Sequence, residues 1–104
     1  MAFLLLVGAS AHASAQPKMI FGQGLNSCGT WTEARRTKSF NAGLSAQWVA
    51  GYLSGMNVES DAPNFLAGTD FDGLVAWIDN YCRANPLDAI ANAAIALKNA
   101  LKAR

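Results

Sequence analysis

Residues 70–102 read DFDGLVAWIDNYCRANPLDAIANAAIALKNALK, and this stretch decides the fold. It contains two successive apolar patterns with the three- and four-residue spacing of amphipathic helices, separated by Asn85-Pro86. Asparagine is a favourable N-cap and proline is tolerated in the first helical turn, so this pair predicts the end of one helix and the start of the next. Because no alternating strand pattern accompanies them, the sequence predicts an all-α protein.

The first of these two helices is expected over residues 72–84, with Asp70 or Asp72 as its N-cap, where an acidic side chain also suits the helix dipole. Its apolar face consists of Leu74, Val75, Trp77, Ile78, Tyr81 and Cys82. The second helix is expected to follow its N-cap Asn85 and to run to about residue 102. Its apolar stripe consists of Leu87, Ile90, Ala94, Leu97 and Leu101.

A third helix is predicted to begin near Ser45, as its N-cap. Its apolar face consists of Trp48, Val49, Tyr52, Leu53 and Met56. Gly51 and Gly55 lie four residues apart in this segment. Because glycine is unfavourable inside a helix, we interpret both as positions where a neighbouring helix or ring approaches closely.

Residues 57–70 are rich in turn-forming residues and are predicted to be a loop, with Phe65 and Leu66 folded onto the core. A short helix capped by Asn26 or Ser27 is expected to hold Cys28 and to end near Arg36. These segments together predict a small helical bundle of about four helices.

The N-terminal residues 1–15 resemble a secretory signal peptide. A short apolar run is followed by small residues with two A-x-A patterns, and we expect cleavage after Ala15, with cleavage after Ala13 as the alternative. A buried N-terminal helix is the alternative, but this stretch has no amphipathic stripe. The prediction is an exported, periplasmic protein whose mature chain is a single helical domain over residues 16–104, without His12, the only histidine.

Cys28 and Cys82 are the only two cysteines. In an oxidising compartment such a pair normally forms a disulfide, and this one would join the first short helix to the C-terminal end of the helix over residues 72–84. A reactive or metal-binding thiol is the alternative, but there is no C-x-x-C motif. The bundle is therefore predicted to be disulfide-linked.

Composition excludes several function classes. The formal net charge is only +1 and 14% of the residues are charged. The chain therefore lacks the excess of basic side chains that binding to nucleic acids requires. The apolar run near the N-terminus is too short to span a membrane. We predict no catalytic residues, because the mature chain would have no histidine and the serines have no visible base. We also predict no metal site and no cofactor, since helix capping explains Asp70 and Asp72 better than calcium binding does.

Protein–protein contact is the remaining class. Most of the aromatic rings must lie in the core of so small a bundle, and we expect one or two at an interface. The candidate protein-binding residues are Trp48, Tyr52, Phe65 and Trp77. Residues 33–38 (EARRTK) form a small basic cluster, which we interpret as a solvated face, with recognition of an acidic partner as the alternative.

A family resemblance is carried by the order of the motifs. Cys28 is followed by WVAGYLSG at residues 48–55, Asp70, YCRANP at residues 81–86 and an Ala-rich amphipathic helix. In these motifs the chain resembles the HdeA/HdeB family of small periplasmic acid-stress chaperones over about residues 26–102. The resemblance implies a helical bundle that often forms a homodimer, which acid dissociates so that apolar surface holds unfolding client proteins.

The chain also resembles, in outline, the Tai-type immunity proteins of type VI secretion, which are exported, helical and disulfide-bonded. That resemblance implies a protein that binds and inhibits a periplasmic cell-wall amidase toxin. The sequence therefore predicts a non-enzymatic exported domain whose partners are other proteins, with an acid-stress chaperone as the leading hypothesis and an immunity protein as the alternative.

Overall fold

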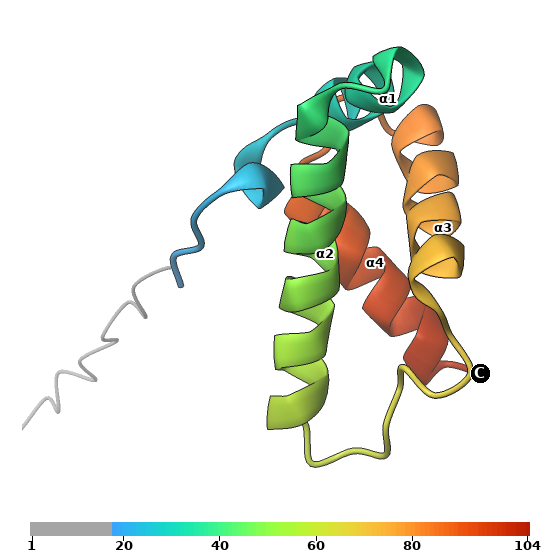
Figure 1. The fold of residues 1–104 in the computed structure, drawn as a ribbon. Coiled ribbons are helices and arrows are strands. Elements are labelled where there is room, and N and C mark those ends of the chain that lie inside the picture. The colour runs from blue at the N-terminus through green and yellow to red at the C-terminus, as the bar shows by residue number, and fades with distance from the viewer. Residues whose placement is uncertain (1–17) are drawn as a thin grey trace, which may run out of the picture.

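The computed structural model describes residues 18–104, so the expected signal peptide over residues 1–15 lies outside the described residues. The described chain has a short 3-10 turn, η1 (Gln23–Leu25), and four α-helices. These are α1 (Cys28–Thr37), α2 (Phe40–Glu59), α3 (Phe71–Ala84) and α4 (Ile90–Lys102). In Figure 1, α1 crosses the end of the bundle where α2 begins and α3 ends, and α4 packs against both α2 and α3. The prediction of an all-α bundle is confirmed.

The core lies where α1, α2, α3 and α4 meet. Val49, Leu53, Ile78 and Ile90 are fully buried, and Leu97 is nearly so. The predicted apolar faces of α2 and α3 are confirmed, because every member is either buried or packed partly buried against this core. The loop after α2 closes the bundle at the end away from α1, as expected from the apolar residues within it.

The start of α1 is fixed to the junction between α3 and α4. The backbone amides of Cys28 and Gly29 donate to the carbonyl oxygens of Asp88 and Pro86, at 2.7 and 2.8 Å. The predicted disulfide between Cys28 and Cys82 is present, and both cysteines are fully buried. A disulfide and two backbone hydrogen bonds therefore join the start of α1 to the end of α3 and the segment that follows it.

The expected start of the last helix at Asn85 is wrong, because α4 begins at Ile90. Asn85 instead caps the C-terminus of α3: its backbone amide and its side-chain Nδ2 both donate to the Tyr81 carbonyl oxygen at 2.9 Å. The carbonyl oxygens of Pro86 and Asp88, between α3 and α4, accept hydrogen bonds from backbone amides of α1. They are therefore not aligned for hydrogen bonds within a helix. Leu87, expected on the apolar stripe, is 96% exposed for the same reason.

The start of α2 also differs from the expectation. The helix begins at Phe40 with Ser39 at the N-cap position, so Ser45 is not its cap. Ser45 lies inside the helix and is 1% exposed, and its hydroxyl oxygen lies 3.2 Å from Oε1 of Gln23 in η1, to which it donates a hydrogen bond. The Ser45 hydroxyl thus holds the N-terminal segment on α2, and Ser39 precedes the helix without a side-chain cap hydrogen bond.

Two glycines of α2 do not serve close packing, contrary to the expectation. A β-carbon on Gly51 or Gly55 would meet no atom within 4 Å, because both lie on the exposed face of α2. Gly24 is the tightly packed glycine: a β-carbon there would overlap the ring of Trp48.

This contrast gives a matched pair of variants. Gly51→Ala is expected to raise the free energy of unfolding by about 0.5–1 kcal/mol, because alanine loses less backbone entropy on folding and has open space here. Gly24→Ala is expected to lower it by about 1–3 kcal/mol through overpacking against Trp48. Urea unfolding followed by circular dichroism measures both, and equal effects of the two variants would contradict this account.

Candidate protein-binding surfaces

Trp48 and Tyr52 lie half-buried on α2 with ring centroids 4.7 Å apart. The Nε1 of Trp48 donates to the Phe21 carbonyl oxygen at 2.7 Å, and its ring covers Gly24. Trp48 therefore holds the segment before α1 on α2, an intramolecular role that the sequence did not reveal. Phe21 itself is largely exposed beside these rings.

Phe65 is not a surface candidate, because it is 4% exposed and belongs to the core. Its backbone amide donates to Oδ1 of Asn57 at 3.0 Å, and its carbonyl oxygen accepts from Arg104 at 2.8 Å. These bonds place the ring under the loop between α2 and α3. The expectation that it folds onto the core is confirmed. In the closed bundle its ring is therefore not available to a partner, and a protein-binding role for Phe65 stays a prediction.

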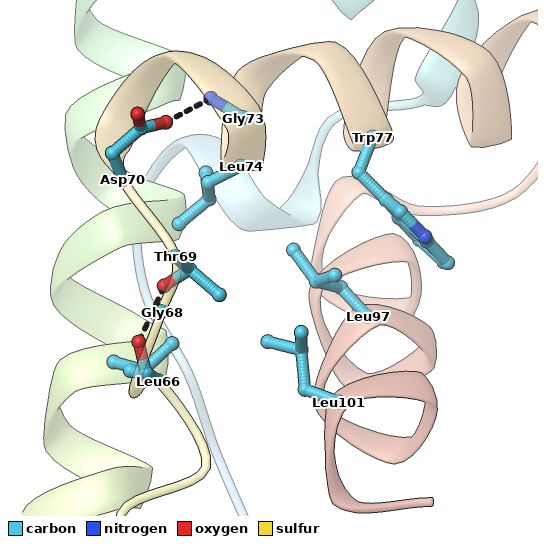
Figure 2. A pocket seen from close by; sticks show the side chains of 9 residues that line it. All are labelled: Leu66, Gly68, Thr69, Asp70, Gly73, Leu74, Trp77, Leu97 and Leu101. Carbon is cyan, nitrogen blue, oxygen red and sulfur yellow. Dashed lines mark hydrogen bonds between the residues drawn. The ribbon is translucent and has the colours of Figure 1, made fainter. Parts of the chain in front are cut away.

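Trp77 lines a small apolar cavity of about 240 Å³ between the loop, α3 and α4 (Figure 2). The cavity is lined by Leu66, Gly68, Thr69, Asp70, Gly73, Leu74, Trp77, Leu97 and Leu101. At its edge, Oδ1 of Asp70 accepts from the Gly73 amide at 2.7 Å, which confirms Asp70 as the N-cap of α3. Asp72 lies exposed in the first turn and is not the cap residue.

The larger apolar surface is a groove between the first halves of α2 and α3, with a volume of about 680 Å³. We call it the α2–α3 groove. Its residues are Arg35, Phe40, Ala42, Gly43, Leu44, Ala46, Gln47, Phe71, Asp72, Val75 and Ala76. Phe40 is 83% exposed, and Leu44 and Phe71 are also exposed. The sequence predicts one or two surface rings but does not identify these two, because neither phenylalanine belongs to the helical stripes that indicate the helices.

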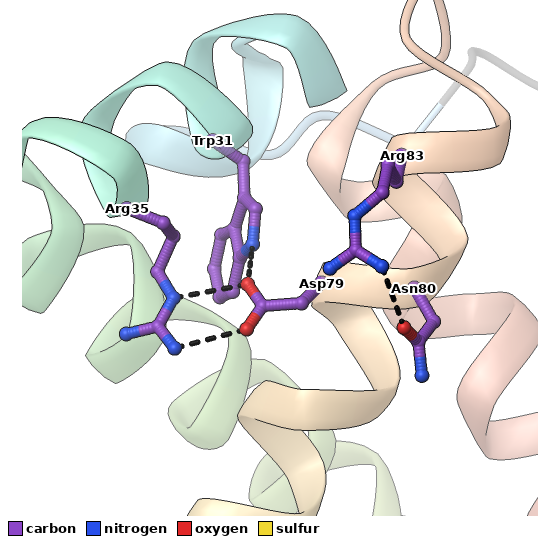
Figure 3. A network of polar contacts seen from close by, with 5 residues as sticks. All are labelled: Trp31, Arg35, Asp79, Asn80 and Arg83. Carbon is purple, nitrogen blue, oxygen red and sulfur yellow. Dashed lines mark hydrogen bonds and ion pairs between the residues drawn. The ribbon is translucent and has the colours of Figure 1, made fainter.

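A network centred on Asp79 joins α1 to α3 at one end of this groove (Figure 3). The Asp79 carboxylate accepts from Nε1 of Trp31 at 2.7 Å and from two guanidinium nitrogens of Arg35, each at 2.9 Å. Burial opposes ionisation of this carboxyl, but the hydrogen bonds from Arg35 and Trp31 outweigh burial and lower its pKa. Arg35, expected on a solvated face, is thus part of a helix junction.

The pKa of Asp79 sets the direction of a pH effect. A lowered pKa in the folded state means that the carboxylate stabilises the fold above the pKa of the unfolded chain, about 3.9 for aspartate. That stabilisation is lost as the pH falls through the lower pKa of the folded state. Asp88 follows the same sign, because hydrogen bonds from Tyr81 and Asn92 lower its pKa.

Asp79→Asn is accordingly expected to lower the free energy of unfolding by about 1.5–3 kcal/mol near neutral pH, the range for hydrogen bonds to a charged group. The difference from the wild type should shrink as the pH falls from neutral through the lowered pKa of the folded state, because the wild-type carboxyl then becomes neutral as well. Urea titrations across this pH range measure it. Asp61→Asn, in an exposed loop, is the control and should change stability by less than about 0.5 kcal/mol.

The residues that the structure describes contain neither a metal-binding cluster nor a membrane-spanning helix. Between residues 18 and 104, no group of three or more histidine, cysteine, aspartate or glutamate side chains could hold a metal ion. None of the helices described there has the length and apolar character that a bilayer crossing requires. Comparisons with protein-family models, curated proteins and solved structures found no match to this chain.

Proposed function

We propose that this protein is an exported protein-binding domain without a catalytic role, and that it acts as an HdeA-like acid-stress chaperone in the periplasm. Trp31, Arg35 and Asp79 form the hydrogen-bonded contact between α1 and α3 that we call the Asp79 junction. The observation that carries the proposal is the position of this junction at the end of the α2–α3 groove. Arg35 lines the groove and also holds Asp79, so a carboxylate that acid neutralises supports the wall of an apolar surface.

Acid also destabilises the closed bundle through the net charge of the whole domain. The chain has seven carboxylate side chains and eight Lys and Arg side chains, so full protonation of the carboxylates leaves a side-chain charge of roughly +8. Self-repulsion then opposes the closed bundle. The Cys28–Cys82 bridge keeps α1 bonded to α3 while the junction loosens, which favours exposure of apolar surface over complete unfolding.

The proposal is tested by measuring the aggregation of a test protein by light scattering. The oxidised mature protein is expected to suppress aggregation and to bind a hydrophobic dye at about pH 2–3, but not near neutral pH. Asp79→Asn is expected to shift the onset of both effects to higher pH. A protein that stays dye-negative and inactive in acid would overturn the chaperone proposal.

An immunity protein is the second candidate, and the exposure of the α2–α3 groove in the folded state favours it. Phe40 and Phe71 are exposed while the Asp79 junction is closed, so one folded partner could bind without acid. This candidate predicts a stable neutral-pH complex with a cell-wall amidase and inhibition of its hydrolase activity. Acid-dependent binding of many clients, with no such complex, would count against it.

A further inference from the structure

We propose that the α2–α3 groove binds, near neutral pH, a protein segment with apolar side chains and carboxylates at the end that lies next to α1. This inference rests on the proposed protein-binding function and specifies the chemistry of the partner.

The groove has the form of a binding site for apolar side chains. Its floor contains Ala46 and Val75, which are 5% and 6% exposed and belong to the packed helices. Phe40 and Leu44 from α2 and Phe71 from α3 rise at its sides and remain exposed. Rings exposed over a floor held by two helices can bury apolar area against a partner at little entropic cost.

The α1 end of the groove is cationic. Arg35 lines both the groove and an adjoining hollow of about 600 Å³, whose other residues are Thr32, Arg36, Lys38, Asp79 and Arg83. Arg36 pairs with Glu33, but both side chains are more than half exposed, so a partner's carboxylate can compete for the guanidinium. Arg83 donates to Asn80, a neutral group (Figure 3). Cationic groups therefore outnumber carboxylates here.

Lys38 gives a second, independent indication. It caps α1 with φ 54°, the one positive φ of a non-glycine residue in the described chain. Glycine is usual at such helix ends, because a β-carbon in this conformation costs roughly 1–2 kcal/mol. The lysine charge also suits the helix dipole at this end of α1. Its side chain lines the hollow beside the groove and has no ion pair within residues 18–104, so the charge is available to a partner.

The other end of the groove argues against a uniformly anionic partner. Asp72 lines it there, seven residues before Asp79 along α3, which corresponds to about 10 Å of helix. A carboxylate at this distance would repel the surface of an anionic membrane. The charge therefore changes sign along the groove, which fits a protein segment whose own charges are unevenly placed.

Selection of random displayed peptides on the oxidised mature protein tests the proposal. Peptides that bind the wild type but not the Phe40→Ser/Phe71→Ser variant are expected to combine apolar residues with Asp or Glu near one end. Both phenylalanines are exposed, so the variant should fold, and its circular dichroism should match the wild type. Overturning results are no enrichment, enrichment without acidic residues, or equal binding to the variant.

Charge is then tested with one selected peptide by fluorescence anisotropy. Replacing its carboxylates by lysine is expected to weaken binding about tenfold or more, through repulsion at the groove end. Lys38→Gly is expected to weaken it about two- to fivefold, the range for an exposed ion pair, while raising the stability of the protein. Lys102→Ser, at the last residue of α4 and outside the groove and the adjoining hollow, is the control and should leave peptide binding unchanged.

Other occupants give distinct outcomes. Binding to phosphatidylglycerol vesicles that Lys38→Gly abolishes would assign the surface to a membrane and overturn the proposal. A dimer in sedimentation that Phe40→Ser/Phe71→Ser dissociates would assign the groove to a second copy, with the same consequence. Peptide binding without aggregation suppression in acid would retain this inference and reject the chaperone, and the reverse result would reject only this inference.

Discussion

A domain that lacks the Cys28–Cys82 disulfide is expected to lose about 4 kcal/mol of its free energy of unfolding. The cysteines are 54 residues apart, and closing so long a loop restricts the unfolded chain strongly. Both cysteines are also fully buried, so their removal leaves space in the core. For a domain of this size the total is about 5–15 kcal/mol, so the loss is a large share.

The Cys28→Ala/Cys82→Ala variant measures this effect in urea titrations. Alanine is preferred to serine at two fully buried positions because it introduces no unpaired hydroxyl. Wild-type protein unfolded in the presence of a reductant separates the entropic effect from the lost packing, since it keeps both sulfur atoms. A loss below about 1 kcal/mol in both experiments, or two free thiols in exported protein, would contradict the expectation.

Trp31→Ala is expected to lower the free energy of unfolding by about 3–5 kcal/mol. The Trp31 side chain is 1% exposed and lies between α1 and the rest of the core. It also donates to Asp79 at 2.7 Å, so truncation removes a hydrogen bond from a partly buried carboxylate as well as apolar packing. The loss should therefore be larger near neutral pH than below the lowered pKa of Asp79, where that carboxyl is protonated.

Trp31→Phe separates the two contributions. Phenylalanine keeps much of the ring but cannot donate, so a loss of about 1–3 kcal/mol is expected near neutral pH. Trp77→Phe provides a comparison in which only ring packing changes, although that ring is half-buried, against the small cavity of Figure 2, and not fully buried. Urea titrations of both variants provide the comparison, and a loss for Trp77→Phe as large as that for Trp31→Phe would contradict the role given to the Asp79 hydrogen bond.

The helices themselves could largely be predicted, because their signals are local. The stripe on α3 and the cap formed by Asp70 depend on residues three or four apart, and both are observed. Ser27 likewise accepts from the Thr30 amide as the N-cap of α1. The disulfide followed from the cysteine count and the expected compartment, which require no knowledge of the fold.

The errors in the two helix starts occur where distant segments meet. Asn85-Pro86 satisfies every local rule for starting a helix, yet α4 begins later because backbone groups of that junction bond to α1. Ser45 has the chemistry of a cap but is buried against Gln23. In each case a hydrogen bond to a segment remote in the sequence replaces the local one.

The sequence by itself determined an all-α chain, the helical faces that form its core and the bridge between its two cysteines, because periodicity, capping and composition are read from neighbouring residues. Only the tertiary structure decided which rings are exposed and which charges meet. Phe65 is buried while Phe40 is exposed, and Arg35 reaches Asp79 from another helix. Exposure and ion pairing depend on how helices are placed against one another, which no local pattern specifies.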